Sequence, residues 1–364
     1  MAKLTDIIGK PLSGEWGNDD ETGDGIPVLR TTNFTNEGVV NYNDVVTRII
    51  TKKNIEEKYL RKGDIIIEKS GGSDKFPVGR VIYFDGEENT YLFNNFTGLL
   101  RVKNQDVWYP KYVFYSLFSN YKRGGTRAFE NKTTGLHNLK IDDYVSRYEV
   151  GEIARNEQVS ICEKLDRLFS VIRLRKQELQ LLNDLIKARF VEMFGDITIN
   201  DKNWKYEPLG ELCTIVRGGS PRPIEQFLGG DVPWIKIGDA TDGDSVFLRS
   251  TKEYIIQEGV KKSRLVKEGS LIFANCGVSL GFARIITFDG CIHDGWLAME
   301  DIDERLDKVF LLQALNQMTE HFRAIAPAGT QPNLNTAIMK AYKQVIPPIE
   351  LQREFISFAK QVNK

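Results

Sequence analysis

The chain has 364 residues, of which 41% are hydrophobic and 27% charged, and its formal net charge is −1. These values are ordinary for a soluble globular protein, and the length allows two or three domains with separate cores. The near-neutral charge argues against a protein that holds nucleic acid by bulk electrostatics alone, because a DNA-binding protein of this balance must concentrate its positive charge locally.

Membrane insertion and secretion are not expected. No run of residues approaches the ~18 apolar positions that a membrane span needs, and the N-terminal MAKLTDIIGK lacks the apolar core of a signal peptide. The four cysteines are scattered without the spacing of a disulfide framework. We therefore expect reduced thiols and a cytoplasmic protein.

The first 150 residues predict short strands followed by one helix. The segments VVTRIIT (45–51), DIIIEK (64–69) and RVIYF (80–84) are β-branched and separated by glycine, which is typical of strands. The apolar segment WYPKYVFYSLFSN (108–120) predicts a helix. We expect a mixed α+β domain and not a parallel doubly wound sheet.

A long helix is predicted from 153 to 194, because this segment contains neither glycine nor proline and Gly195 provides a stop. Its length would be about 60 Å at ~1.5 Å per residue. Arg175 and Arg189 occupy two positions of the apolar seam, either extended toward solvent or paired with a carboxylate of a partner subunit. The seam follows a 4-3-4-3 heptad spacing and comprises Ile161, Leu165, Leu168, Ile172, Arg175, Leu179, Leu182, Ile186, Arg189 and Met193.

The second half of the chain repeats the first. GIPVLRTTN (25–33) matches DVPWIKIGD (231–239), about 206 positions later. Four further pairs follow in the same order: 61–72 with 267–278, 78–86 with 281–290, 124–128 with 328–332, and 137–140 with 332–335. The segment DKVFLLQALNQM (307–318) predicts the second helix. We infer a tandem duplication.

The duplication predicts the architecture. We expect an α+β protein with two similar β-rich globular domains, 1–150 and 197–346, joined by the long helix of 151–196. A shorter helix over 347–364, with Phe355, Phe358 and Val362 on one face, is expected to return antiparallel, which relates the halves by a pseudo-two-fold axis. Because this helix is short, the apolar positions between Leu179 and Met193 need another cover: a homologous chain, a partner subunit or a C-terminal extension.

These features resemble the specificity subunit of type I restriction–modification systems. The resemblance is carried by GGSPRPIEQF, VPWIKIGD and VIPPIELQREF in the second half, and by GDIIIEKSGGS and PVGRVIYF in the first. It extends over essentially the whole chain. One departure is that the first copy carries Asn156 where the family has glutamine, whereas the second copy keeps Gln352.

The resemblance implies a function. In that family each target recognition domain reads one half of a split sequence in double-stranded DNA, and the helices set the gap between the halves. The helices and domains also bind two methyltransferase subunits, which carry S-adenosylmethionine and modify adenine. A motor-nuclease restriction subunit is an optional further partner, and this chain would hold no cofactor itself.

Candidate DNA contacts lie at strand ends and in loops. Arginine suits guanine, whereas asparagine and glutamine suit adenine. For each residue the alternative is an ordinary solvated turn. The candidates in the first copy are Arg30, Thr31, Thr32, Asn33, Lys69, Ser70, Gly71, Gly72, Ser73, Lys75, Arg127, Asn131, Thr133, Thr134 and His137. Those in the second are Arg217, Ser220, Arg222, Lys236, Asn275, Ser279, Thr330, Gln331 and Asn333. The copies differ most in these loops, which predicts an asymmetric target.

Other chemistries are poorly supported. The sequence has no Asn/Asp-Pro-Pro-aromatic motif for adenine methylation, and the triplet Glu130-Asn131-Lys132 lacks the preceding Pro-Asp strand of nucleases. Cys276, Cys291 and His293 lack the paired spacing of a metal site. We expect a non-catalytic subunit without a metal. A duplicated protein-interaction scaffold or inhibitor that never contacts DNA is the remaining alternative.

Overall fold

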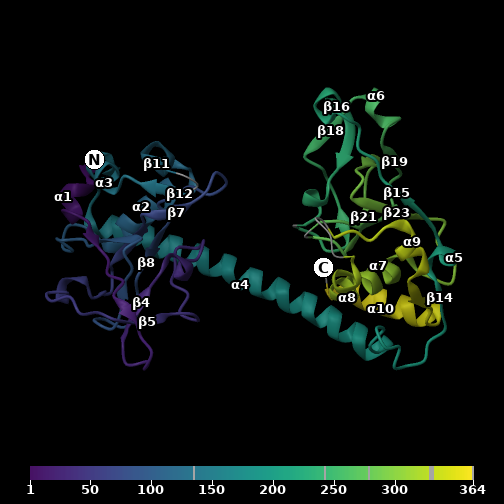
Figure 1. The fold of residues 1–364 in the computed structure, drawn as a ribbon, viewed down its shortest axis with the longest axis horizontal. Coiled ribbons are helices and arrows are strands. Elements are labelled where there is room, and N and C mark those ends of the chain that lie inside the picture. Colours follow the sequence, from purple (N-terminus) through teal and green to yellow (C-terminus); the bar gives the residue numbers. More distant parts are fainter. Residues whose placement is uncertain (134–135, 242, 278, 328–331, 363–364) are drawn as a thin grey trace. The chain divides into compact units, whose positions relative to one another are not determined.

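The computed structural model describes residues 1–133, 136–241, 243–277, 279–327 and 332–362. They form two compact units, Met1–Leu174 (unit 1) and Arg175–Lys364 (unit 2). Figure 1 labels the elements of each unit, which are described separately below.

The main sheet of unit 1 is antiparallel, with the strand order β2-β10-β6-β8. The strands are Leu12–Ser13 (β2), Thr97–Leu100 (β10), Ile65–Glu68 (β6) and Val81–Tyr83 (β8). Side chains of β6 point alternately to two cores: Ile65 and Ile67 pack with helix α2 (Pro110–Lys122), and Ile66 packs with Leu29 and Phe93. Burial of both faces explains why Ile65, Ile66 and Ile67 are all apolar and do not alternate with polar residues.

A second sheet in unit 1 has the order β3-β5-β4-β9. It consists of Asn18–Asp19 (β3), Val46–Ile49 (β5), Ile26–Leu29 (β4) and Leu92–Phe93 (β9), and β4 and β9 are parallel. The remaining elements are helices α1 (Leu4–Ile8) and α3 (Ile141–Arg147), the sheet of β11 (Glu130–Thr133), β12 (Leu136–Leu139) and β7 (Ser70–Gly72), and the pair β1 (Ala2–Lys3) with β13 (Glu149–Val150).

Unit 2 repeats this plan. Its main sheet has the order β15-β23-β20-β21-β17, formed by Thr214–Arg217, Trp296–Glu300, Leu271–Ala274, Ala283–Ile286 and Phe247–Leu248. Its second sheet has the order β18-β16-β22-β19, formed by Glu253–Ile255, Leu228–Ile235, Gly290–Ile292 and Arg264–Val266, and β16 and β22 are parallel. The other elements are α5 (Leu209–Leu212), α6 (Gln257–Val260), α7 (Lys308–Gln317), α8 (Thr319–Ile325), α9 (Thr336–Ala341), α10 (Ile349–Val362) and the pair β14 (Tyr206–Pro208) with β24 (Lys343–Val345).

The predicted duplication is confirmed by these topologies. The first four strands of each main sheet correspond in order, and each second sheet contains a parallel pair at the same place in the chain. Three of the five sequence matches fall on corresponding elements. The fifth falls on β12 in unit 1 and on an isolated bridge at Asn333 in unit 2; the fourth, at 124–128 and 328–332, lies mostly outside the described residues in its second copy. The sequence predicted one helix per copy, α2 and α7; unit 1 adds α1 and α3, and unit 2 adds α5, α6, α8 and α9.

Helix α4 (Arg155–Phe194) is the predicted long helix, with 40 residues. It ends at Gly195, whose φ of 76° favours glycine. The first half of α4 belongs to unit 1, where it is fixed to α2. Asp166 accepts a hydrogen bond from the Tyr115 hydroxyl (2.5 Å) and pairs with Lys111 (2.8 Å), and Phe169 stacks on Tyr115.

The second half of α4 belongs to unit 2, where it packs against α10 and α7 (Figure 1). Phe190 contacts Phe194, Phe310 and Phe355, with ring centroids 4.9, 5.8 and 5.4 Å away. Ile186, Phe190 and Met193 are therefore buried by the chain's own helices. The expectation that another molecule covers the whole stretch from Leu179 to Met193 is wrong for these positions.

Both seam arginines are paired within the chain. Arg189 forms ion pairs with Glu192 (2.9 Å) and with Glu354 of α10 (3.2 Å), and its guanidinium lies over the Phe358 ring. Arg175 pairs with Glu178, one turn along its own helix. Neither guanidinium therefore needs a partner subunit's carboxylate in this structure.

A buried glutamine joins each long helix to its domain. In unit 1, Gln158 accepts from the Tyr109 N–H and donates to the carbonyls of Val107 and Ile153. In unit 2, Gln352 accepts from the Asp307 N–H and donates to the carbonyls of Arg305 and Pro347. The two side chains are 1% and 0% exposed. The assignment of Asn156 to this family position is thus wrong; Gln158 fills it.

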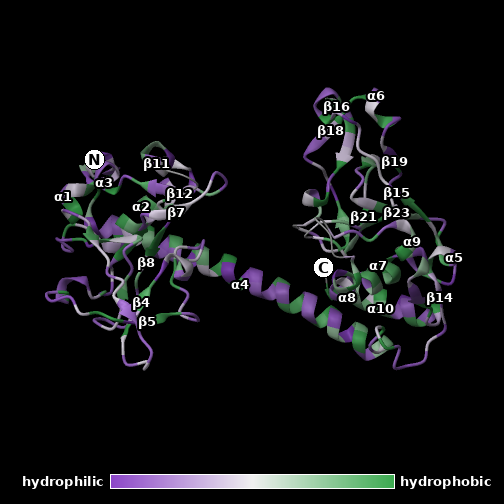
Figure 2. Ribbon diagram, in the orientation of Figure 1, coloured by the Kyte–Doolittle hydropathy of each residue, from purple (hydrophilic) through white to green (hydrophobic). Residues whose placement is uncertain are grey.

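The middle of α4 exposes an apolar stripe. Among the seam residues Ile161, Leu168, Ile172 and Leu179 are exposed, as are Val171, Leu174, Leu181 and Leu185 beside them. Figure 2 shows hydrophobic residues along this helix. Leu179 is 62% exposed, which is unusual for an apolar residue in a heptad pattern.

Candidate nucleic-acid interface

The same helical turn follows the first strand of the parallel pair in each unit. In unit 1 the Arg30 N–H donates to Asn33 Oδ1 (2.8 Å) and the Asn33 N–H donates to the Arg30 carbonyl (2.9 Å). In unit 2 the Lys236 N–H donates to Asp239 Oδ2 (2.9 Å) and the Asp239 N–H donates to the Lys236 carbonyl (3.1 Å). These reciprocal bonds fix turns 31–33 and 237–239, which present one basic residue each at the edge of the sheet.

The second strand of each parallel pair ends beside this turn. The Asn94 N–H donates to the Leu29 carbonyl (2.9 Å), and the His293 N–H donates to the Ile235 carbonyl (3.2 Å). A glycine approaches each strand end: a Cβ on Gly14 would overlap the carbonyls of Phe93 and Asn94, and one on Gly218 would overlap those of Ile292 and His293. The backbone here requires glycine in both copies.

A third loop completes each edge. The Lys69 N–H donates to the Phe96 carbonyl and the Lys69 carbonyl accepts from the Leu139 N–H. In unit 2, the Asn275 N–H donates to the Gly295 carbonyl and the Asn275 carbonyl accepts from the Leu334 N–H. The candidates after β6 and β20 are thus brought to the strand ends where Asn94 and His293 lie. We call these two corresponding surfaces the polar edges of units 1 and 2.

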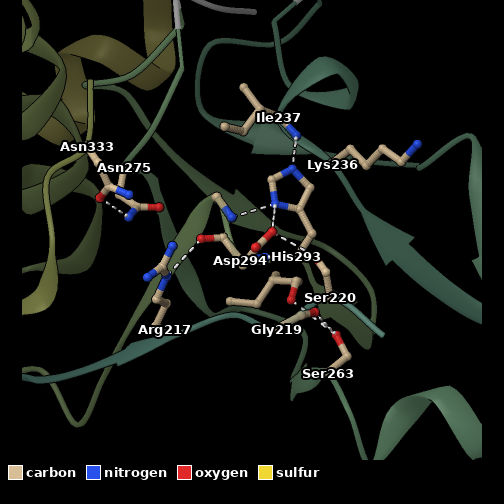
Figure 3. A network of polar contacts seen from close by, with 12 residues as sticks. Arg217, Gly219, Ser220, Lys236, Ile237, Ser263, Asn275, His293, Asp294 and Asn333 are labelled. Carbon is tan, nitrogen blue, oxygen red and sulfur yellow. Dashed lines mark hydrogen bonds and ion pairs between the residues drawn. The ribbon is translucent and has the colours of Figure 1, made fainter. Parts of the chain in front are cut away.

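Asp294 organises the polar edge of unit 2 (Figure 3). Its carboxylate accepts from the Ser220 hydroxyl (2.7 Å) and pairs with Arg222 (3.7 Å), and its carbonyl accepts from Arg217 Nε (3.0 Å). The Ser220 and Arg222 contacts are among those that hold the pKa of Asp294 below its usual value, although its partial burial acts in the opposite direction. Three predicted contacts are therefore held by one residue: Ser220 and Arg222 by its carboxylate, and Arg217 by its backbone carbonyl.

His293 lies in the polar edge of unit 2, between Gly295 and Ile237. Its Nδ1 accepts from the Gly295 N–H (2.6 Å), and its Nε2 lies 3.3 Å from the Ile237 N (Figure 3). Burial lowers the pKa of His293, because the interior disfavours the charged imidazolium. A neutral imidazole has one acceptor nitrogen, so the shorter bond from Gly295 fixes Nδ1 as the acceptor, and the Nε2 side of the ring lies beside the turn at 237–239.

The basic residues of the two turns are held by carboxylates. Arg30 bonds the carbonyl (3.0 Å) and the carboxylate (2.9 Å) of Asp44. Lys236 pairs with Glu253 and lies over the Trp234 ring, 5.1 Å from its centroid. Lys69 bonds the Ser13 hydroxyl (2.9 Å), and burial lowers its pKa. Each side chain is oriented before any ligand arrives.

Three predicted base contacts are buried in the structure. Asn33 donates to the carbonyls of Asn41 and Asp44, His137 bonds Glu130 (3.0 Å), and Asn275 donates to Asn333 Oδ1 and to the Leu334 carbonyl. Because their polar atoms are engaged inside the fold, the structure gives them a supporting role for the loops. Direct contact of these three with a base is corrected on this ground.

The other candidates are accessible to different degrees. Arg222 is 76% exposed, and Arg127 reaches the carbonyls of Asp74 and Lys75. Exposed candidates are Thr32, Gly71, Ser73, Lys75, Arg127, Asn131, Arg217 and Arg222; half-buried ones are Arg30, Thr31, Lys69, Ser70, Gly72, Ser220, Lys236, Ser279 and Asn333. Thr134, Thr330, Gln331 and the side chain of Thr133 lie outside the described residues.

Sequence reasoning missed Asp294 as the organiser of this edge, and considered His293 only as a metal ligand. One signal was available: the third sequence match ends at Gly290, so the polar residues that follow the next short strand, HDG (293–295), correspond to NN (94–95). Within the described ranges no group of three or more His, Cys, Asp or Glu side chains is placed to hold a metal ion. No helix in the described part of the chain is long and apolar enough to cross a membrane.

Comparison with known proteins bears on both units. The model of the type I restriction modification DNA specificity domain matches residues 2–184 and again residues 201–364. The chain belongs to this specificity family. The two matches confirm the family expected from the sequence, and they give one specificity domain in each half, as the α+β duplication predicted.

Individual relatives are distant. The MjaIX specificity subunit of a type I restriction enzyme from Methanocaldococcus jannaschii is 20% identical over 176 residues, which span 47% of this chain and 40% of that subunit. The crystal structure of a type I S subunit from M. genitalium is 17% identical, with a TM-score of 0.57 over 99% of this chain and 88% of that chain. A chain from a structure of type I R-M complex assembly and conformational transition is 14% identical, with a TM-score of 0.51 over 100% of this chain and 89% of that chain. These structural likenesses establish a shared fold for the specificity domains.

Proposed function

We propose that this chain is the DNA-recognition subunit of a type I restriction–modification complex, with each unit reading one half of a bipartite target. The observation that carries the proposal is the pair of corresponding polar edges in two specificity domains. The same backbone frame presents Arg30 and Ser70 in unit 1, and Lys236 and Cys276 in unit 2. Different side chains on one frame favour two different half-sites.

Base readout in this proposal comes from the exposed and half-buried candidates. Arginine and lysine on the edges are matched to guanine, and Asn131 and Asn333 to adenine. The buried Asn33 and the half-buried Asp294 orient their neighbours. The chain's −1 net charge limits its non-specific affinity, so tight binding depends on base contacts and on positive charge supplied by partners.

The proposed partners are double-stranded DNA and two methyltransferase subunits, which bind S-adenosylmethionine; a motor-nuclease subunit is optional. In this scheme the chain performs no chemistry and holds no cofactor. The exposed stripe of α4 supports docking of helices from these subunits, because exposed leucines at heptad spacing are stabilised when a second helix covers them.

A half-domain exchange tests the proposal. Genomic DNA from cells carrying the complex is sequenced for adenine methylation, with the natural chain and with a chimera whose residues 1–150 come from a relative of different specificity. We expect one half of the modified motif to change and the other to stay. A complex that methylates the same motif after exchange, or a chain that binds its partners but no specific duplex, would support the scaffold or inhibitor function instead.

A further inference from the structure

A basic cleft of about 490 Å³ lies in unit 1 at the opposite ends of the strands from the polar edge. Asp64 precedes β6 and Arg101 follows β10, whereas the polar edge has Lys69 after β6 and Phe96 before β10. The charged side chains that line it are five basic ones, Lys10, Arg61, Lys62, Arg101 and Lys103, and two acidic ones, Glu57 and Asp64. The proposed function gives this surface no role.

On the floor of the cleft, the positive charge of Arg101 is neutralised by the Asp64 carboxylate. Arg101 binds the buried Asp64 carboxylate through Nε (2.7 Å) and a terminal nitrogen (2.6 Å). Two further N–H groups donate to the carbonyls of Glu57 (2.8 Å) and Tyr59 (2.7 Å). Most donors of this arginine are therefore engaged within the protein, and it holds the wall in place.

The rim is not compensated. Lys10, Arg61, Lys62 and Lys103 are exposed, and none of them forms an ion pair with any residue in the described part of the chain. Four unpaired cations around one concavity repel each other, and a multiply charged anion relieves that repulsion.

The backbone accommodates one of these cations closely. The Lys103 N–H donates to the Ile7 carbonyl (3.0 Å), and the Lys103 ammonium lies over Gly9 at the end of α1. A Cβ at Gly9 would collide with this ammonium, and the φ of 74° at this position also favours glycine. The glycine therefore leaves room for the lysine to lie against the cleft.

The corresponding cleft of unit 2 has the opposite charge. It has about 350 Å³, lies between the α5–β15 turn and the residues after β23, and is lined by Glu211, Asp301, Asp303 and one basic residue, Lys340. An anion that suits the cleft of unit 1 is repelled here. The positive charge is therefore a property of unit 1 and not a requirement of the fold. If two identical partner subunits bound the two units in the same way, they would not need a positive charge in unit 1 alone.

We propose that the basic cleft of unit 1 binds a phosphate-bearing ligand. Lysine and arginine bind phosphate through charge-assisted hydrogen bonds, and phosphate offers more negative charge per volume than a peptide carboxylate. Leu12 and Leu99 provide apolar wall for the group that carries the phosphate, and the volume lies within the range of about 300–1,000 Å³ common for ligand sites. The phosphate comes either from the DNA backbone or from a free pyrophosphate or nucleotide.

Calorimetry of the full chain with inorganic pyrophosphate tests the site. We expect one pyrophosphate per chain, and at least about 10-fold weaker binding for Lys62→Glu/Lys103→Glu. The matched control is Lys53→Glu/Lys164→Glu, which makes the same charge change at exposed lysines of unit 1 outside the cleft and should shift affinity less than about 2-fold. Thermal melting of both variants checks that the surface substitutions leave the fold intact.

Salt dependence of binding to a non-target duplex separates the two sources. If the phosphate is DNA backbone, the slope of log affinity against log salt falls by about 2 in Lys62→Glu/Lys103→Glu, since each lost phosphate contact removes about 0.9. If it is a free phosphate, this slope is unchanged and only pyrophosphate binding is lost.

Absence of saturable pyrophosphate binding together with an unchanged slope would overturn the proposal. So would binding of polyglutamate, but not pyrophosphate, that depends on Lys62 and Lys103, because this outcome assigns the cleft to an acidic protein. The half-domain exchange described above reads the polar edges and is independent of these results, so failure of one proposal is distinguishable from failure of the other.

Discussion

The polar edges of the two units share their backbone and differ in how their side chains are held. In unit 1 each group has its own local partner, such as Asp44 for Arg30. In unit 2 a single residue, Asp294, holds Ser220 and Arg222 through its carboxylate and Arg217 through its backbone carbonyl. The comparison indicates that the frame is maintained by backbone bonds and glycines, whereas recognition chemistry is assigned to side chains that are free to differ.

The helical seams differ in a second way. Unit 2 buries Phe190 and Phe194 between α10 and α7, while the half of α4 in unit 1 stacks one partly exposed Phe169 on Tyr115. In unit 2 the aromatic side chains of α4 are buried by the unit's own helices, whereas in unit 1 the aromatic side chain of α4 is only partly covered. The following expected results test both comparisons, beginning with the largest effect.

Truncation of the seam aromatics should affect unit 2 far more than unit 1. Phe190→Ala removes a ring that is 1% exposed, so we expect the free energy of unfolding of unit 2 to fall by about 3–5 kcal/mol. Phe169→Ala should cost unit 1 roughly 1–2 kcal/mol, because that ring already contacts water. Hydrogen exchange in denaturant reports each unit separately; equal losses would contradict the difference between the seams.

The buried glutamines should be equally important. Gln158→Ala and Gln352→Ala each remove three hydrogen bonds and leave buried backbone groups without partners, so we expect a loss of about 3 kcal/mol in the unit concerned. Gln180→Ala on the exposed face of α4 is the control and should change stability by less than about 0.5 kcal/mol. A small effect of Gln158→Ala alone would mean that the two buried glutamines are not equivalent.

Removal of the Asp294 carboxylate and removal of the Asp44 carboxylate should each lower the affinity for a different half of the DNA target. Asp294→Asn weakens the support of Ser220 and Arg222, and we expect about 10-fold lower affinity that depends only on one half of the target. Asp44→Asn loosens Arg30 and should affect only the other half. Binding is measured with the assembled complex on duplexes mutated in one half at a time, and the interpretation fails if both variants respond to the same half.

The smallest effect expected is a pH dependence confined to unit 2. Burial lowers the pKa of His293 below its ordinary value of 6.5, so the unfolded chain takes up this proton at a higher pH than the folded one. Stability therefore falls as the pH drops through about 6.5. His293→Asn introduces the residue of the corresponding position in unit 1, and it should lessen the loss between pH 7.5 and 5.5 by under about 1 kcal/mol.

His321→Asn is the matched substitution control, because His321 lies on α8 outside the polar edge. Melting curves across this pH range that are identical for the natural chain and His293→Asn would contradict the lowered pKa of His293.

Much of the fold followed from the sequence because the duplication constrains it. β4 and β16, β6 and β20, and β8 and β21 lie where matching segments predicted them, and α4 ends at the expected glycine. The edge strands β2 and β15 are short, so their periodicity is weak. The parallel pairing of β4 with β9 joins residues about 60 positions apart, which no local pattern reports.

The site was less predictable than the fold. Loops after β6 and β20 were correctly grouped, because their positions in the two copies correspond. Burial was not foreseen: Asn33, His137 and Asn275 have the residue types of base contacts, but tertiary hydrogen bonds engage them. The sequence paired Asn156 with Gln352, whereas the hydrogen bonds to backbone groups before α2 and α7 identify Gln158 as the counterpart of Gln352.

The reciprocal bonds of turns 31–33 and 237–239 have an evolutionary consequence. Each turn is closed by its first and last residues, Arg30 with Asn33 and Lys236 with Asp239. The residues between them, Thr31 and Thr32 or Ile237 and Gly238, contribute nothing to that closure. A lineage could therefore acquire a new target preference by single point changes at these intervening positions, without first having to rebuild the scaffold that displays them.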